Sequence, residues 1–435
     1  MRLLATRLTA IASAVKRLFS PASLFRNAEQ GVWYDPSDLS TLFQDSAGTV
    51  PVTAVEQPVG LMLDKSGRGN HATQATSTKR PTLSARVNLL TKSEDFADAV
   101  WSKSTSSITA NAVIAPDGTL TADTITAVSG AYPSVFVTTT VISSSAHTLS
   151  VFAKAGTNNK LSLEFRGVTA TPNANFNLDL GTVISGTGAI SAVGNGWYRC
   201  SVTVTSIDTS ELPIIGMGDL TTTGSSIYIW GAQLETGSTA TRYQRVNTAT
   251  DYDTVGFKHY LKFDGIDDSL ATASIDFTST DKMTVFAGVR KLSDAANGIV
   301  CELSAATGVN PSSFRVTVPG TPGAATYESV VCGSTGTQTP AIVSGLAAPN
   351  TSVLSVSQVI STGQTIRANG GAVIGTSLGA GAGNYGNYPL YIGSRAGTSI
   401  PFNGHLYSLI VRGTASTDAQ IASAESYVNG KTGAY

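Results

Sequence analysis

Short runs in which apolar and polar residues alternate dominate the chain from about residue 31 onward. In residues 284–290, Val285, Ala287 and Val289 share one side of an extended chain, because successive side chains of a strand point to opposite faces. In two further runs the same alternation assigns to buried faces Leu161, Leu163 and Phe165, and Tyr407, Leu409 and Val411. Glycine- and serine-rich turns separate the runs, so the pattern predicts antiparallel sheets with one face buried.

Residues 2–19 are the first of two segments with a helical period. Their apolar residues recur at spacings of four and three, at Leu4, Leu8, Ile11, Val15 and Leu18. A cleaved signal peptide, an amphipathic membrane helix and a docking or oligomerisation helix all have such a stripe. We favour the docking helix, because an isolated helix this short is marginal in water and its apolar stripe needs a partner.

The second helical segment closes the chain. Thr417 and Gln420 have the spacing of a capping box, and Ile421 and Ala424 begin an apolar face. We expect a short helix here that ends at Gly430.

Composition supports an all-β chain and excludes several classes of protein. The 435 residues suggest about three units, and charged residues make up only 13% against a usual value of about 25%. The formal net charge of −1 argues against a nucleic-acid-binding protein. There is no run of 18 apolar residues, so we expect no membrane span. The distant Cys200, Cys301 and Cys332 are expected to be small buried apolar residues rather than metal ligands.

Two distant segments read as parts of one domain. Residues 260–270 look like the continuation of residues 61–83, although a self-contained stretch lies between them. We therefore predict an N-terminal helix in residues 1–30, a discontinuous β-sandwich in residues 31–85 plus 250–435, and a second sandwich inserted at residues 86–249. The predicted fold is two antiparallel jelly rolls, one inside the other, with a helical arm at the N-terminus and a short helix at the C-terminus.

Several short sequence motifs of the discontinuous part resemble those of a known family. They are Trp33-Tyr34-Asp35, residues 64–72, residues 263–268, Tyr391-Ile392-Gly393 and the final helix with Tyr427. Together they resemble the concanavalin-like, or laminin-G-like, jelly rolls of many phage virion proteins. The resemblance covers roughly 240 residues and implies fold more strongly than ligand.

The inserted stretch carries phrases of its own. They lie at residues 88–96, 148–156, 194–200 and 227–237, and their order is similar to that of the carbohydrate-binding-module-like jelly rolls of phage fibre and decoration proteins. Trp101, Trp197 and Trp230 belong to this stretch. Such rings either stack on sugars or fill the core, and for Trp197 and Trp230 we expect the core.

The resemblances imply a phage virion structural protein, more often of the tail than of the head. Such a protein would dock on other virion proteins through residues 1–30, form a homotrimer and present its sandwiches to a host-surface glycan. A head decoration or bracing protein without sugar binding and a polysaccharide depolymerase are the alternatives. The sequence lacks a nucleophile elbow, a phosphate-binding loop and a zinc-protease helix, so we expect no enzyme activity and no cofactor.

Two sets of residues are candidates for binding. Aromatic, amide and guanidinium groups next to flexible glycines suggest a glycan site, for which the candidates are Tyr385, Asn387, Tyr388, Tyr391, Arg395 and Trp101. An oligomer interface is the alternative for the 385–395 segment. Asp264, Asp267 and Asp268 offer oxygen ligands for calcium. They also suit a turn in which the carboxylates cap backbone N–H groups, and we favour the turn and expect no bound metal.

Overall fold

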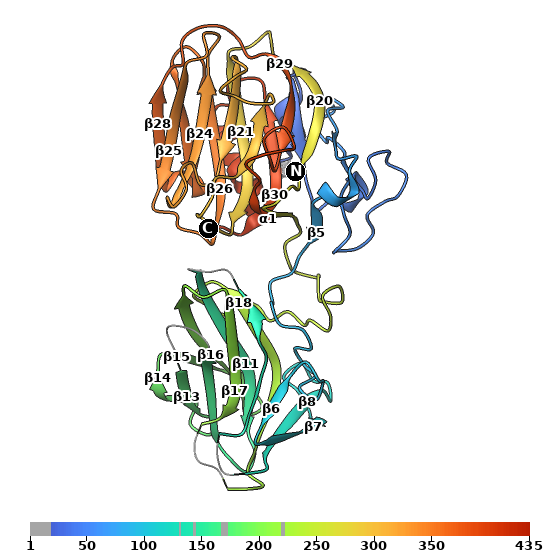
Figure 1. The fold of residues 1–435 in the computed structure, drawn as a ribbon, viewed down its shortest axis with the longest axis vertical. Helices are drawn as coiled ribbons and strands as arrows, with labels where there is room; N and C mark the ends of the chain where they lie inside the picture. Colours follow the sequence, from blue (N-terminus) through green and yellow to red (C-terminus); the bar gives the residue numbers. More distant parts are fainter. Residues whose placement is uncertain (1–18, 130–131, 142–144, 167–172, 219–221) are drawn as a thin grey trace, which may run out of the picture.

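The chain is described here from a computed structural model, which covers residues 19–129, 132–141, 145–166, 173–218 and 222–435. The described residues form two β-sandwiches in two lobes (Figure 1). The predicted fold class is therefore confirmed, with one sandwich inserted into the other. The expected docking residues Leu4, Leu8, Ile11, Val15 and Leu18 lie outside the described residues.

The outer sandwich is the lobe that contains both the early and the late segments of the chain (Figure 1). Sheet A consists of β1 (Gly31–Tyr34), β5 (Thr82–Ser84), β19 (Tyr260–Asp264), β21 (Lys282–Lys291), β26 (Asn350–Val359), β27 (Gly363–Ala368), β28 (Val373–Leu378) and β30 (Asn403–Arg412). Sheet B consists of β2 (Leu42–Phe43), β3 (Leu61–Met62), β4 (Ala72–Thr73), β20 (Leu270–Asp276), β22 (Ile299–Leu303), β23 (Ser313–Thr317), β24 (Thr326–Cys332), β25 (Gln338–Ser344) and β29 (Asn387–Ile392). The described part of this lobe also has four short 3-10 helices, namely η1 (Pro21–Phe25), which precedes β1, and η2 (Leu39–Thr41), η3 (Ser77–Lys79) and η4 (Asn369–Gly371), which lie between strands.

Strands from both sides of the insert pair directly in this lobe. Strand β1 lies antiparallel to β30, with Val32 opposite Val411, and β5 lies antiparallel to β19, with Leu83 opposite Leu261. In sheet B, β4 pairs with β20. Each sheet thus joins residues more than 170 positions apart, which makes the middle of the chain an insertion.

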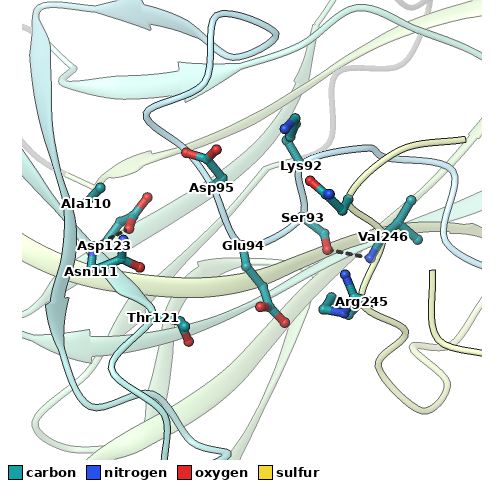
Figure 2. A pocket seen from close by; sticks show the side chains of 11 residues that line it. Lys92, Ser93, Glu94, Asp95, Ala110, Asn111, Thr121, Asp123, Arg245 and Val246 are labelled. Carbon is teal, nitrogen blue, oxygen red and sulfur yellow. Dashed lines mark hydrogen bonds between the residues drawn. The ribbon is translucent and has the colours of Figure 1, made fainter. Parts of the chain in front are cut away.

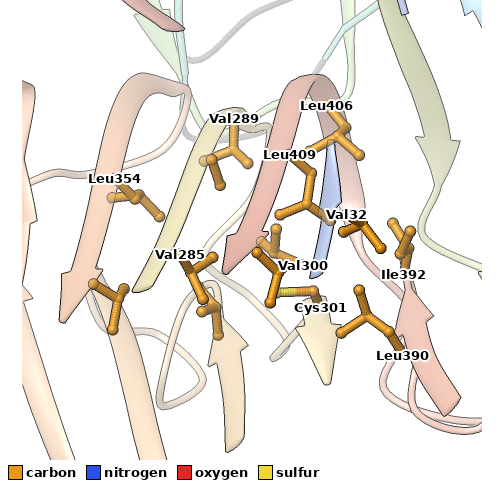
Figure 3. Packing of buried hydrophobic residues seen from close by; sticks show 14 of the residues in the cluster. Val32, Val285, Val289, Val300, Cys301, Leu354, Leu390, Ile392, Leu406 and Leu409 are labelled. Carbon is orange, nitrogen blue, oxygen red and sulfur yellow. The ribbon is translucent and has the colours of Figure 1, made fainter. Parts of the chain in front are cut away.

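The core of the outer sandwich lies between sheets A and B (Figure 3). Val285 and Leu409 of sheet A face Cys301 and Ile392 of sheet B, and all four are at most 1% exposed. The alternation predicted at Val285, Ala287 and Val289 is confirmed, since all three belong to this core.

The predicted alternation is wrong at Tyr407. The register of β21 and β30 shifts between Gly288 and Val289, so a β-bulge inserts one residue into β30. Leu406 enters the core beside Leu409, while Tyr407 packs against the ring of Tyr260 at 5.3 Å.

The closing helix α1 (Asp418–Thr432) covers the outer face of sheet A. Thr417 and Gln420 form the predicted capping box. The helix continues past Gly430, and its cap is Gly433, whose φ of 66° is left-handed; Gly430 is therefore not the stop that the sequence suggested. Within the described residues, no helix is long and apolar enough to cross a membrane.

The start of the described chain packs beside this helix. Leu24 and Phe25 are buried in one cluster with Trp33 and with Val428 of α1. The predicted arm of residues 1–30 therefore includes a stretch, from residue 19 onward, that packs against the outer sandwich.

The inserted sandwich occupies the other lobe (Figure 1). Sheet C consists of β6 (Ser102–Ser104), β9 (Ser134–Phe136), β10 (Thr139–Thr140), β12 (Lys160–Arg166), β13 (Asn173–Asn177), β14 (Thr182–Gly186) and β17 (Ser210–Met217). Sheet D consists of β7 (Ser106–Val113), β8 (Ala122–Ala127), β11 (Ser145–Ala155), β15 (Gly188–Gly194), β16 (Trp197–Ser206) and β18 (Ser226–Thr236). Leu161, Leu163 and Phe165 are buried between the two sheets, as predicted.

Hydrogen bonds between two buried side-chain amides and the backbone hold the two ends of the insert together. Asn88 is fully buried and its amide donates to the carbonyl oxygens of Ala232 and Gln244 at 2.9 and 3.1 Å. The side chain of Gln244 in turn accepts from the backbone N–H of Val87 at 2.7 Å. Because both amides are buried and paired, the entry and exit chains are held side by side.

Candidate functional site

The first glycan candidate, Tyr385, lies in the core of the outer sandwich. It is 1% exposed, its hydroxyl donates to Oε1 of Gln358 at 3.0 Å, and its ring meets Phe314 edge-on at 6.1 Å. A ring buried in this way presents no face to a sugar. The glycine-rich surroundings suggested an exposed loop, but the side chain of Tyr385 points inward.

The other four residues of that segment are divided between the two sides of sheet B. Tyr388 shares the inner side of β29 with Leu390 and packs against the core, whereas Tyr391 pairs with Glu302 on the outer side. Asn387 is exposed at the start of β29. Tyr388 and Tyr391 are three residues apart and so point to opposite sides of the strand, while Asn387, four residues before Tyr391, shares its outer side. The two tyrosines therefore make no single aromatic platform.

Arg395 is held in a buried ion pair. Its Nε and Nη2 donate to the two carboxylate oxygens of Glu302 at 2.9 and 3.2 Å, and Glu302 is 0% exposed. This bidentate geometry fixes the guanidinium.

The tryptophans of the insert are core residues. Trp101 is 1% exposed, and its indole N–H donates to the carbonyl of Lys92 at 3.0 Å. Trp197 and Trp230 are 2% and 5% exposed, as expected. Trp101 is therefore a structural anchor of the loop that opens the insert rather than a stacking surface. The three cysteines are free and buried, as expected.

The acidic triad forms a turn. Asp264 accepts backbone N–H groups from Ile266 at 2.8 Å and from Asp267 at 3.3 Å, and Asp268 accepts from Asp264 N–H at 3.0 Å. The three carboxylates lie within 4.8 Å of one another. Burial, with the charge of Asp264, raises the pKa of Asp268 to about 6. Capping of the turn accounts for this cluster, and nothing beyond the cluster itself points to a cation.

A polar hollow of about 280 Å³ opens where the insert begins and ends (Figure 2). It lies between residues 92–95, the strands β7 and β8, and residues 245–247. Figure 2 shows Glu94 and Asp95 extending in opposite directions from the chain. None of the described residues that line it is aromatic, so it offers no ring on which a sugar would stack.

Two carboxyl groups of this hollow are partly shielded from water. Burial raises the pKa of Glu94, whose Oε1 accepts the hydroxyl of Tyr243 at 3.1 Å. Burial also raises the pKa of Asp123, although its two oxygens accept the backbone N–H groups of Phe96 and Asn111, each at 2.9 Å. Asp123 therefore links β8 to β7 and to the segment around Phe96. Glu94 is the carboxyl group of this hollow that is better placed to transfer a proton.

A larger groove of about 430 Å³ crosses the outer face of sheet C. Three neighbouring strands each contribute one side chain, directly opposite the next, and these are Phe136 of β9, Ile214 of β17 and Glu164 of β12. On the next rung is Gly216, where a Cβ atom would lie 2.8 Å from the carbonyl oxygen of Pro133. The groove therefore has an apolar floor at Phe136 and Ile214, and at Gly216 the glycine lets the backbone of Pro133 approach β17 closely.

An exposed tyrosine and an ion pair border this groove. Tyr132 is 61% exposed and has a φ of 45°, a strained conformation for a bulky residue. Nε and Nη2 of Arg166 donate to the Glu164 carboxylate at 2.8 and 3.1 Å. This hydrogen-bonded pairing raises the pKa of Arg166, and Tyr132 lies near enough to add to the effect. An aromatic face and a polar pair thus stand on one groove, which suits a sugar ring and its hydroxyl groups.

Sequence reasoning missed this groove. The alternation that places Leu161, Leu163 and Phe165 inward leaves Glu164 and Arg166 on the outward side, but it gives these two residues no role. Tyr132 stands between an alanine and a proline without any strand pattern. A lone aromatic residue in a turn was the available signal.

Comparison with known proteins adds little to this geometry. No protein-family model matches the chain, and no curated protein matches it. Among solved structures, the CBM40 of Ruminococcus gnavus IT-sialidase has 15% identity and a TM-score of 0.28, over 34% of this chain and 84% of that one. The LG4-5 domains of mouse laminin alpha1 have 10% identity and a TM-score of 0.29, over 63% and 85%. The binding domain of botulinum neurotoxin serotype D has 7% identity and a TM-score of 0.31, over 39% and 42%. Because these scores are low, the fold is argued from the strand pairing alone.

Proposed function

We propose that this chain is a non-enzymatic, glycan-binding structural protein of a phage particle, and that the groove on sheet C holds the glycan. The observation that carries the proposal is Tyr132, an exposed ring held at a strained φ beside the Arg166–Glu164 pair. Strain of this kind persists where the surroundings enforce it and is common at binding sites. A sugar would stack on the ring while its hydroxyl groups bond to the pair.

The attachment to a particle rests on the sequence resemblance and on the position of the chain start. Residue 19 lies by α1 on the outer sandwich, with the rings of Phe19 and Tyr427 6.5 Å apart. The groove is lined by strands of the inserted sandwich, and this sandwich forms the other lobe (Figure 1). Because residue 19 and the groove lie on different lobes, a protein that docks through its N-terminus would present the insert outward. We propose a tail fibre or receptor-binding component that forms a homotrimer, since repetition strengthens weak glycan contacts.

A glycan array with the full chain tests the groove. We expect binding to at least one host-surface polysaccharide, and its loss in Tyr132→Ala and in Arg166→Gln. The matched control is Tyr435→Ala, because Tyr435 is likewise exposed, at 55%, and lies far from the groove in sequence. Absence of binding to any polysaccharide, or equal loss in the control, would contradict the proposal and favour a decoration or bracing role.

Particle attachment needs a separate test. Leu24 and Phe25 are core residues, so the deletion should stop at residue 18. We expect a folded protein that no longer joins particles. Normal incorporation of this deletion variant would contradict docking through the N-terminus.

A depolymerase is the second candidate, favoured by Glu94 in the polar hollow. A raised pKa is what a general acid needs, but glycoside hydrolysis usually needs a second carboxyl group across the bond. A reducing-end assay on host capsule or lipopolysaccharide, with Glu94→Gln as the variant, separates the two functions. Release of reducing ends that disappears in the variant would establish the enzyme.

A further inference from the structure

A second hollow, of about 300 Å³, lies on the outer sandwich, over the outer face of sheet B. Arg315 and Thr317 of β23 and Glu328 of β24 stand on this face, with Thr317 directly opposite Glu328. Arg395 reaches the same hollow from the loop after β29. These residues come from three separate segments, which the sheet brings together.

The charges in this hollow balance. Nη1 of Arg315 donates to Oε1 of Gln338 at 2.8 Å, and its Nη2 is 3.5 Å from Oε1 of Glu328. Arg395 is paired with the buried Glu302. Two guanidinium groups are thus matched by two carboxylates, so neither an anion nor a cation would meet a site of purely opposite charge.

Two buried polar atoms of the hollow have no hydrogen-bond partner among the residues that the structure describes. Thr317 is 2% exposed and its Oγ1 is unpaired. Oδ1 of Asn297 is also unpaired, while its Nδ2 donates to the carbonyl of Gly320 at 3.0 Å. Because buried polar atoms are nearly always paired in folded proteins, two such atoms in one hollow point to a ligand that supplies hydrogen bonds.

We propose that this hollow binds a single uncharged sugar residue. Sugar hydroxyl groups both donate and accept, so they can donate to Oδ1 of Asn297, bond with Oγ1 of Thr317 and accept from Arg315. A volume near the lower end of ligand pockets, which run from about 300 to 1,000 Å³, suits one ring rather than a chain. This site lies on a different sandwich from the groove of sheet C and does not depend on it. Together the two would make the protein bivalent.

Calorimetric titration of the full chain with neutral methyl glycosides tests the site, with glucuronate and glucosamine as the charged probes. The decisive variant is Thr317→Val, which removes the unpaired hydroxyl and keeps the shape. We expect about tenfold weaker binding of the neutral sugar, as for the loss of one good hydrogen bond. The matched control is Thr339→Val, since Oγ1 of Thr339 is also buried and unpaired but does not line the hollow.

The results separate this site from the groove. Tyr132→Ala and Arg166→Gln should leave the titration unchanged, whatever they do on the glycan array. Tighter binding of a charged probe would overturn the assignment to a neutral sugar. The site itself would be refuted by absence of sugar binding, by ordered water alone at Thr317 in a crystal soaked with the sugar, or by an equal loss in Thr339→Val.

Discussion

The outer and inserted sandwiches share an architecture but differ in how their outer faces are covered. On the outer sandwich, α1 lies over sheet A, with Ala424 and Val428 fully buried. Over sheet B, Glu302 is buried beneath a loop whose Thr307 donates its backbone N–H to the carboxylate at 2.7 Å. On the inserted sandwich, the face of sheet C carries an open groove with an exposed tyrosine and an exposed ion pair.

This difference separates a supporting lobe from a presenting lobe. Covering a sheet with a helix or with loops removes its side chains from contact with large ligands. An uncovered sheet face keeps rows of side chains available at fixed spacing, because alternate residues of each strand point outward. The inserted sandwich therefore suits an extended glycan, while the outer sandwich leaves room for one small ligand.

The largest expected effect comes from removing a core ring in either lobe. Phe165→Ala in the insert and Phe263→Ala in the outer sandwich each delete a side chain that is at most 1% exposed. Each should lower the free energy of unfolding by about 3–5 kcal/mol, and only in its own lobe. Calorimetry that resolves two transitions checks this. If both transitions shift in either variant, the lobes do not fold independently.

Ion pairs should respond according to their burial. Glu302→Gln leaves the partly buried Arg395 without its carboxylate and should cost about 3 kcal/mol. Glu164→Gln breaks a pair whose arginine side chain is 54% exposed, which should cost about 1 kcal/mol or less. Chemical denaturation measures both changes. Equal losses would contradict the assignment of a covered and an uncovered face.

The stability of the outer sandwich should depend on the titration of Asp268. Its folded pKa is about 6 and its ordinary value is 3.8, so the folded state binds the proton more tightly. Stability should therefore fall as the pH rises from about 4 to above 6. Asp268→Asn should remove that slope and stabilise the lobe at neutral pH by about 1–2 kcal/mol. A slope that calcium abolishes in the unaltered protein would instead identify the acidic triad as a metal site.

A comparably small effect concerns the helix that covers sheet A. Thr417→Ala removes the side chain that accepts the N–H of Gln420 and should cost about 1 kcal/mol, again only in the outer lobe. Thermal unfolding measures the change, and Thr417→Ser, which keeps the hydroxyl, is the control. An equal loss in the serine variant would show that the cap is not the cause.

Local patterns predicted more of the fold than of the sites. Alternation located the buried faces at Val285 and Leu161, and the capping box located α1. The same pattern failed at Tyr407, because a bulge depends on the partner strand β21. Local composition predicted the wrong exposure for Tyr385, because a tyrosine among glycines gives the same sequence pattern whether its side chain is buried or exposed. Tyr132 carried only the weak signal of a lone aromatic residue in a turn, and Thr317 carried none, because their importance lies in neighbours that are distant along the chain.

The sequence by itself determined that this protein is all-β, that it ends in one capped helix, and which side of many strands is buried. These properties depend on residues within one turn or one strand of each other. Only the tertiary structure decided which sheet faces stay open and which polar atoms are left unpaired. Those properties arise where strands, loops and the helix from separate segments come into contact. Residue spacing along the chain does not predict which segments make those contacts.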